Sequence, residues 1–449
     1  MSQPSSTGEG ASRFKARAGL LSIVGLLYAS ACGGPYGTED YIVQTGPGLL
    51  LLLLVAAPWL WGVPTAFATA ELSSARPVEG GYLRWIREVL GPFWGFQAGV
   101  WTLTASCLDM ALYPVLFAEA LHYWVPGISP FGRWLAAVVF IALLTWINYR
   151  GIEIAGAAAV GLNVFLIAPL IWIVIAGIAK ARFNPLVPFL APGVNPWTGL
   201  GEGMALAIWF YSGYTEVSSA AEEIDRPGRT IPLALLIVTP LVVVSYAAPM
   251  LAGLAAFGSW ETWTSGQFAL IGEALGGRIL GHWTFLGSVA SFTVIFIAYV
   301  LWYSRLTWSM AADGALPAFL AKLHPKHGTP HRVLLLYAIV YSALAALPFR
   351  DLLVIDLWVF GAYDLLLLAT PIRARRVYAD RPAGFRIPGG SVGVWLNFLV
   401  PAATYVVALA ATAGDYLISG SAAILLGPAL YLGMRFVRRF SPPFGRRPV

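Results

Sequence analysis

Three acidic residues stand inside long apolar stretches of the sequence: Asp109, Glu216 and Asp364. Charged side chains at membrane depth are costly and usually functional, so each acid is a candidate contact for a cationic substrate group, a proton or an ion. The simpler alternative for each is a carboxylate that hydrogen-bonds a helix end or closes a gate. Nearer the end of their stretch, Glu39 and Asp40 would attract cations or would lie in an ordinary solvated helix end.

Two clusters of helix-breaking residues interrupt stretches that would otherwise be helical. The first reads Gly33-Gly34-Pro35-Tyr36-Gly37 and the second reads Tyr211-Ser212-Gly213-Tyr214-Thr215-Glu216. Gly and Pro disfavour a regular helix, so each cluster frees backbone N–H and C=O groups in the middle of its stretch. Inside a membrane such groups are tolerated only where they line a cavity or meet a ligand. A lone Gly or Pro is more often packing or a kink, but two clusters at the same depth favour a binding site.

The two breaks offer complementary partners for a small zwitterion. Freed amides near Gly33, Gly34 and Gly37 would bind a substrate carboxylate, helped by the positive end of the following half-helix. Carbonyl groups near Tyr211 and Gly213 would accept from a substrate ammonium. A polyamine has no carboxylate, so acidic side chains would have to bind it instead.

Aromatic residues beside the breaks could surround a cation or an apolar side chain. Membrane aromatics are more often packing, so Tyr211 and Tyr214, which flank the second break, are the stronger candidates. The expected substrate site comprises Cys32, Gly33, Gly34, Tyr36, Gly37, Asp109, Tyr113, Trp209, Tyr211, Ser212, Gly213, Tyr214, Glu216 and Asp364.

The composition indicates that membrane helices position these residues. Of the 449 residues, 58% are hydrophobic and 11% are charged, against roughly 25% charged in ordinary globular proteins. So few charges could not cover a soluble fold of this size, and the 18 Trp and 19 Tyr suit anchoring at the membrane interface. Because the sequence has no metal-ligand spacing, phosphate loop or nucleophile–base pattern, we expect no metal, no cofactor and no enzymatic activity.

Twelve apolar stretches are long enough to cross a bilayer, which takes about 20 residues. They are 19–45, 48–72, 92–123, 133–149, 155–179, 200–224, 231–256, 279–308, 332–349, 352–372, 392–412 and 417–436. With a cytoplasmic N-terminus, this count places 23 of the 28 Lys and Arg residues on the cytoplasmic side; the remaining 5 are Arg133, Lys180, Arg182, Arg278 and Arg350. This asymmetry supports the count, two cytoplasmic termini and a multi-pass location in the inner or plasma membrane. The net charge of +6 therefore marks one side of a membrane, not a nucleic-acid surface.

The breaks fall in the first and the sixth stretch, which predicts an internal repeat of five plus five helices. Because five is odd, the second copy enters the membrane from the opposite side and the repeats are inverted. We expect a disordered cytoplasmic N-terminus (1–18) and a single transmembrane domain (19–438), followed by a cytoplasmic tail (439–449). The domain would contain a first repeat (19–180), a second repeat (200–374) and two peripheral helices (392–436).

Five motifs in order resemble the amino acid–polyamine–organocation superfamily of transporters, and its polyamine-uptake and cationic amino acid branch in particular. They are the first break with its extension Thr38-Glu39-Asp40, then Pro77-Val78-Glu79-Gly80-Gly81-Tyr82, Asp109-Met110-Ala111-Leu112-Tyr113-Pro114, Ala221-Glu222-Glu223-Ile224-Asp225-Arg226-Pro227, and Ala311-Ala312-Asp313-Gly314-Ala315-Leu316-Pro317. The resemblance runs from about residue 19 to about residue 375.

The resemblance implies an all-α membrane fold of the leucine-transporter type, with twelve helices and two of them broken. It implies uptake of an amino acid or polyamine by alternating access, coupled to a proton or a sodium ion. Relatives commonly carry an acid directly after the aromatic residue of the second break, where this chain has Thr215 and only then Glu216. Some proton-coupled relatives carry a Lys in the fifth helix, and residues 155–179 contain none. The role of the acid and the coupling ion therefore stay open.

Rival interpretations are a polyamine-selective transporter and a non-transporting nutrient sensor on the same fold. A sensor would typically add a long cytoplasmic tail, whereas about ten residues follow the twelfth stretch. An exchanger with a disulfide-linked partner would usually carry a Cys in the loop 124–132, which has none, and the two cysteines, Cys32 and Cys107, lie in apolar runs. A disulfide-linked partner is therefore not expected.

Overall fold

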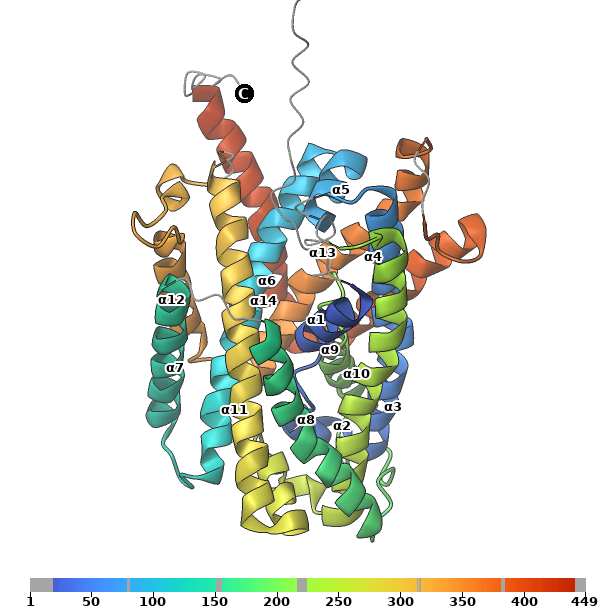
Figure 1. Cartoon of the computed structure of the whole chain (residues 1–449), viewed down its shortest axis with the longest axis vertical. Coiled ribbons are helices and arrows are strands. Elements are labelled where there is room, and N and C mark those ends of the chain that lie inside the picture. Colours follow the sequence, from blue (N-terminus) through green and yellow to red (C-terminus); the bar gives the residue numbers. More distant parts are fainter. Residues whose placement is uncertain are drawn as a thin grey trace, which may run out of the picture.

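The computed structural model describes residues 19–78, 81–150, 156–215, 224–312, 314, 316–380 and 384–440. Its regular elements in these residues are helices, packed side by side along the long axis of the molecule (Figure 1). The first half contains α1 (Leu20–Ala31), α2 (Thr38–Thr45), α3 (Pro47–Ala57), a π-helical segment (Pro58–Gly62), α4 (Val63–Ala75), α5 (Gly81–Leu90), α6 (Pro92–Ala120), α7 (Pro130–Arg150) and α8 (Gly156–Ala179). The second half contains α9 (Pro196–Phe210), α10 (Pro227–Phe257), α11 (Gln267–Ala312), α12 (His331–Leu344), α13 (Phe349–Val377) and α14 (Gly390–Phe440). Short 3₁₀ turns lie at Leu121–Tyr123, Trp260–Thr262 and Ala318–Ala321.

The helices have the surface of a membrane protein. Seven helical stretches in the described residues have the length and apolar composition to cross a bilayer. In the most apolar window of α7 only 28% of the residues are buried in the protein, so most of its apolar side chains face outward. An apolar surface of this kind is stable against lipid and not against water. The prediction of an all-α integral membrane protein is confirmed.

The first apolar stretch is broken where its Gly and Pro cluster predicts. α1 ends at Ala31, Cys32 is extended (φ −135°, ψ 102°), and α2 begins only at Thr38. Gly34 has a φ of +85° in the left-handed region, which only Gly adopts at little cost. α1 packs on α10 and α2 packs on α9, so the break lies inside the bundle.

In the sixth stretch, α9 ends at the predicted place. α9 ends at Phe210, and residues 211–215 are not helical. Glu216 and the continuation of this stretch to residue 223 lie outside the described residues.

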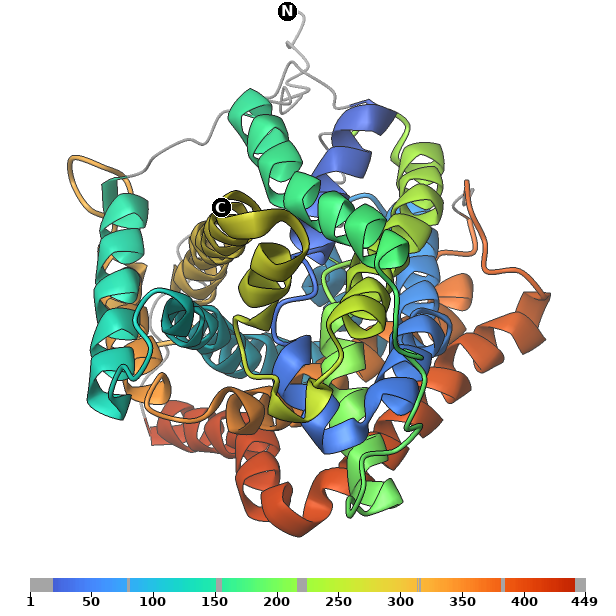
Figure 2. The same ribbon diagram turned by 90° about the horizontal axis from the view of Figure 1, so that it is seen from below.

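Three expected stretches have different bounds in the structure. The stretch predicted at 279–308 is part of the longer α11, whose backbone leaves helical geometry at Gly276 and Gly277. Both final stretches, predicted at 392–412 and 417–436, lie within α14, whose ribbon changes direction along its length (red in Figure 2).

The contacts of α14 show where its parts lie. Its first residue, Gly390, accepts a hydrogen bond from Arg375 near the C-terminal end of α13. Tyr416 donates to Asp351 at the opposite end of α13 (2.6 Å). Further on, Tyr431 packs on Phe93 at the start of α6 (ring centroids 5.0 Å apart). The start of α6 lies at the same face of the bundle as the C-terminal end of α13, because α6 directly follows α5 and Glu88 of α5 accepts a hydrogen bond from Tyr378, just after α13. The first residue of α14 and Tyr431 near its other end therefore lie at the same face of the bundle.

Helix α13 is held at both ends by ion pairs to other helices. Near its start, Arg350 Nη2 lies 2.7 Å from Glu202 Oε1 of α9. Near its end, Arg375 Nε lies 2.7 Å from Glu71 Oε1 of α4, and Glu71 also accepts the backbone N–H of Ile387 (2.7 Å). Both carboxylates are buried, so removing the Arg of either pair would leave a buried charge without its partner.

Candidate functional site

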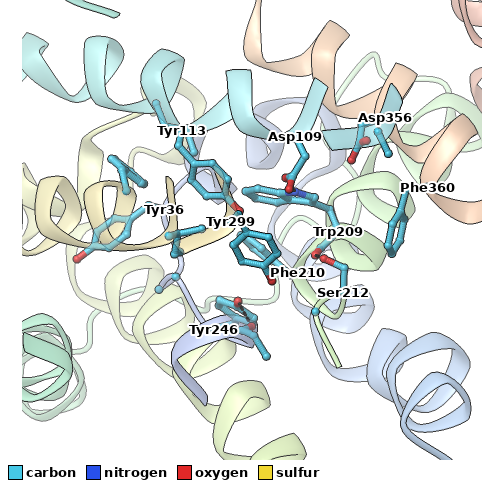
Figure 3. A pocket seen from close by; sticks show the side chains of 18 of the residues that line it. Tyr36, Asp109, Tyr113, Trp209, Phe210, Ser212, Tyr246, Tyr299, Asp356 and Phe360 are labelled. Carbon is cyan, nitrogen blue, oxygen red and sulfur yellow. Dashed lines mark hydrogen bonds between the residues drawn. The ribbon is translucent and has the colours of Figure 1, made fainter. Parts of the chain in front are cut away.

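The two breaks face a common cavity of about 50 Å³ (Figure 3). It lies between α1, α6, α9, α10, α11 and α13, and its walls are Ala31, Gly33, Gly34, Tyr36, Ala105, Asp109, Tyr113, Leu116, Trp209, Phe210, Ser212, Gly213, Tyr246, Phe292, Ile295, Tyr299, Tyr303, Asp356, Phe360 and Tyr363. This volume holds a few water molecules. The cavity is therefore narrow as it stands, and a larger solute requires its walls to move apart.

Two carboxylates line the cavity. Asp109 of α6 accepts a hydrogen bond from the indole Nε1 of Trp209 of α9 (2.8 Å). Asp356 of α13 is 3% exposed, and its Oδ1 has no hydrogen-bond partner in the described part of the chain. The two carboxyl groups are close enough to interact electrostatically, and Figure 3 shows both near Trp209. No Lys or Arg of the described residues lines this cavity, so its side chains favour a positively charged ligand.

Aromatic rings form most of the remaining wall. Tyr113 lies beside Trp209, with ring centroids 6.0 Å apart. Phe210 stacks on Tyr246 at 4.3 Å, with an angle of 13° between the ring planes. Tyr36 meets Phe292 edge to face at 5.8 Å. Such rings can contact a cation through their faces and can also hold the methylene groups of an organic amine.

Side chains bind carbonyl groups freed by the first break. Tyr246 Oη donates to the carbonyl of Ala31 (2.8 Å), and Ser291 Oγ donates to that of Gly33 (2.7 Å). These bonds tie the break to α10 and α11.

The backbone N–H of Gly37 donates to Glu39 Oε2 (2.6 Å). Glu39 is fully buried, which excludes the interpretation of this residue as part of a solvated helix end. The N-terminal end of α2 thus carries a carboxylate supplied by the chain itself, which suits the positive end of a helix dipole.

The structure brings many of the predicted site residues together. Gly33, Gly34, Tyr36, Asp109, Tyr113, Trp209, Ser212 and Gly213 all line the cavity. Cys32 lies behind the break, in a second, mostly apolar cavity of about 170 Å³ between α1, α8, α10 and α11. Gly37 lies next to the cavity wall, since a Cβ built on it would meet Leu116 and Phe349.

Three other predicted residues are not in the cavity wall of the described structure. Tyr211 is fully buried and donates to the carbonyl of Leu54 in α3 (2.6 Å). Tyr214 is fully buried against Gly62 of the π-helical segment. Asp364 is 1% exposed and lies behind the cavity, beside Trp61. The fourth, Glu216, is outside the described residues.

Sequence reasoning missed Asp356, Tyr246, Tyr299 and Tyr303. Asp356 carries the same signal as Asp364, because both are acids inside one apolar stretch. Eight residues separate them, which is about 80° around an α-helix beyond two full turns. They consequently face different neighbours, and only Asp356 reaches the cavity. The three tyrosines belong to α10 and α11, whose sequences give no break or charge to single them out.

This arrangement, an apolar helical bundle with broken helices around a buried acidic and aromatic cavity, is that of a membrane transport protein. A family model described as amino acid permease matches residues 19–433. The chain belongs to this family, which confirms the resemblance to the amino acid–polyamine–organocation superfamily.

Curated relatives cover most of this chain. A probable polyamine transporter of Arabidopsis thaliana is 32% identical over 423 residues, which are 93% of this chain and 87% of the relative. A polyamine transporter of the same plant is 33% identical over 417 residues, 92% of this chain and 84% of the relative. A polyamine transporter of Oryza sativa subsp. japonica is 32% identical over 424 residues, 94% of this chain and 78% of the relative. The chain is thus similar to transporters over nearly its whole length.

Proposed function

We propose that this protein is a secondary active transporter of organic amines, with polyamines as its preferred substrates. The observation that carries the proposal is the pair Asp109 and Asp356 in one aromatic-walled cavity, which no described Lys or Arg lines. Two carboxylates can neutralise two ammonium groups, and rings such as Trp209 can contact the chain between them. The relatives' names point to the same class of substrate.

The first break supports an amine over an amino acid. An amino acid would place its carboxylate against free amides at the start of a half-helix. At α2 the amide of Gly37 already donates to Glu39, so it is not free for the carboxylate of a substrate. Gly33 and Gly34 line the cavity and are the alternative anchor for an amino acid, the substrate that the family's description suggests.

The transport cycle we propose is alternating access around this cavity. The ion pair Arg350–Glu202 joins α13 to α9 at one face, and Arg375–Glu71 joins α13 to α4 at the other. Both are formed while the cavity is narrow, as expected of a closed intermediate. When the cavity opens toward one face, the ion pair at that face would separate, and the ion pair at the opposite face would stay formed.

We propose the topology that the sequence predicts. It has twelve spans, two inverted repeats (19–180 and 200–374) and two peripheral spans, with both termini in the cytoplasm. The return of α14 to its starting face supports counting it as two spans. The Lys and Arg asymmetry supports the orientation.

Counterflow into proteoliposomes tests this function. Liposomes loaded with unlabelled spermidine should accumulate labelled spermidine, and liposomes loaded with leucine should accumulate little labelled leucine. Asp109→Asn and Asp356→Asn should each weaken spermidine affinity about tenfold or more, because an ammonium left unpaired at membrane depth costs a few kcal/mol. Asp380→Asn removes an exposed carboxylate between α13 and α14 and is the matched control.

Other outcomes separate the rivals. Counterflow of amino acids without polyamines would make the protein an amino acid permease with a different use for the two acids. No counterflow of either substrate by folded protein, despite binding, would favour the nutrient sensor.

A further inference from the structure

Asp364 is a buried carboxyl group that the cavity does not use. It lies in the middle of α13 with 1% of its surface exposed, and its Oδ1 has no hydrogen-bond partner among the described residues. The indole of Trp61 in the π-helical segment lies beside it, and Trp61 Nε1 is likewise buried without a hydrogen-bond partner among the described residues. An acid kept at this depth without a counter-ion is costly, so a role in function is expected.

The surroundings of Asp364 supply no cation. No ion pair of the described residues includes it. The helices packed against α13 carry Tyr82, Arg84, Arg87 and Glu88 on α5, Asp109, Tyr113 and Glu119 on α6, Glu202 on α9, and Tyr405, Asp415 and Tyr416 on α14. Of these, Tyr82 stacks on Tyr363 of α13 (ring centroids 5.9 Å apart), and Tyr405 donates to the carbonyl of Trp358. On α13 itself, Tyr363 is adjacent, Asp356 lies eight residues before Asp364 and Arg373 nine residues after it. α4 contributes Glu71, which is paired with Arg375 at the face of the bundle.

We propose that Asp364 binds and releases the proton that drives transport, an inference that rests on the transport function proposed above. A sodium ion would need several oxygen ligands, whereas the neighbour of this carboxyl group is an N–H donor. No cluster of three or more His, Cys, Asp or Glu side chains that could hold a metal ion occurs in the described residues. On the outer side, one oxygen of the carboxylate takes a proton from a hydronium ion: an O–H bond of the hydronium ion breaks, and an O–H bond forms on Asp364. On the cytoplasmic side that bond breaks as a water molecule takes the proton and becomes a hydronium ion.

The position of Trp61 connects this site to the substrate cavity. Its ring lies 6.0 Å from that of Phe360, which lines the cavity, and 6.3 Å from that of Tyr405 of α14. The residue after it, Gly62, faces the second break, since a Cβ there would lie 3.0 Å from Tyr214 Cε2 and 3.3 Å from Tyr211 Cβ. π-helical segments often mark functional sites. A charge change at Asp364 therefore acts on a segment that touches both the cavity wall and the α9 break.

Uphill uptake and counterflow distinguish proton coupling from substrate binding. In proteoliposomes with an imposed pH gradient, acid outside, the wild type should concentrate labelled spermidine. Asp364→Asn should reduce this accumulation at least tenfold, while its spermidine counterflow without a gradient stays within about twofold of the wild type. A pH-sensitive dye inside the liposomes should record proton entry with spermidine for the wild type and none for the variant. Asp380→Asn should behave as the wild type in all three measurements.

Several results would overturn the inference. They are full accumulation by Asp364→Asn, wild-type accumulation driven by a sodium gradient alone, or loss of counterflow together with accumulation in a folded variant. If Asp364→Asn does not fold, Asp364→Glu keeps the acid and should shift the pH midpoint of uptake; an unchanged midpoint would then contradict the role. Absence of spermidine counterflow by the wild type would instead refute the proposed function, so the two failures can be told apart.

Discussion

Trp209 and Asp109 are joined by a hydrogen bond of 2.8 Å from the indole Nε1 to the carboxylate Oδ1. The bond links the last turn of α9, just before its break, to the middle of α6. The bond occupies one acceptor lone pair of the Asp109 carboxylate and fixes the direction in which the remaining lone pairs of this carboxylate point. Trp209 thus both contacts the cavity and orients the acid that we expect to bind the substrate.

Replacing Trp209 with Phe tests this relationship. Trp209→Phe keeps an aromatic ring but removes the donor, and a hydrogen bond to a charged group contributes about 1.5–3 kcal/mol. We expect the KM for spermidine to rise about tenfold with little change in maximal rate, because Asp109 is left less well oriented. Trp197→Phe, at an exposed position on the same helix, is the control. Equal KM values for the wild type and Trp209→Phe would contradict the orienting role.

Gly34 offers a test of the first break. Its φ of +85° is unfavourable for any residue with a Cβ by about 1–2 kcal/mol. A Cβ there would also lie 2.8 Å from Cε2 of Tyr36, which lines the cavity. Gly34→Ala should therefore lower the initial rate of spermidine uptake at least tenfold, at a membrane expression within about twofold of the wild type.

The control for Gly34 lies in the half-helix just before the break. Gly25 is in α1, and a Cβ built on it meets no atom within 4 Å. Gly25→Ala should transport normally. Normal transport by Gly34→Ala as well would remove the break from the substrate site.

The parts of the structure that local chemistry dictates were predictable from the sequence. Clustered Gly and Pro predict the end of α1 near Cys32, and Gly213 predicts the end of α9 near Tyr211. Apolar helices follow from composition and length. Eight of the predicted cavity residues are those fixed by these two breaks and by the acid-bearing motif of α6.

The direction in which a side chain faces was less predictable. Tyr211 and Tyr214 flank the break in sequence, but the non-helical backbone turns both rings toward α3 and the π-helical segment. Asp356 and Asp364 look equivalent in sequence, but they point about 80° apart around α13, and only Asp356 lines the cavity. The two final stretches appear as one helix because the residues between them, near Gly414, are compatible with helical geometry.

The proposed orientation can be checked by thiol labelling. Lys326 is exposed between α11 and α12, at the face expected to be cytoplasmic, and Arg278 is exposed at the opposite face. In intact cells an impermeant maleimide should label Arg278→Cys and leave Lys326→Cys unlabelled until the membrane is opened. Unmutated protein, with its Cys32 and Cys107 inside the bundle, gives the background. Labelling of Lys326→Cys alone in intact cells would reverse the topology.

Glu88 links α5, an amphipathic helix at the face expected to be cytoplasmic, to the end of α13. Partial burial acts to raise its pKa, but hydrogen bonds from Tyr378, Arg76 and Arg84 outweigh it, and the pKa falls below the ordinary glutamate value of 4.5.

A carboxyl group with a lowered folded-state pKa stabilises the protein above its unfolded-state pKa, and this contribution is lost as the pH falls through the folded-state value. Glu88→Gln should therefore lower the melting temperature at about pH 7 by about 1–2 °C, a small effect because the group is partly solvated. The difference between the two proteins should vanish once the pH is well below 4.5. Thermal unfolding of detergent-purified protein, followed by Trp fluorescence across this range, measures both quantities. Glu261→Gln, an exposed glutamate at the opposite face, is the matched control and should show no pH-dependent difference. A constant offset between wild type and Glu88→Gln at every pH would mean that packing, not charge, explains the loss.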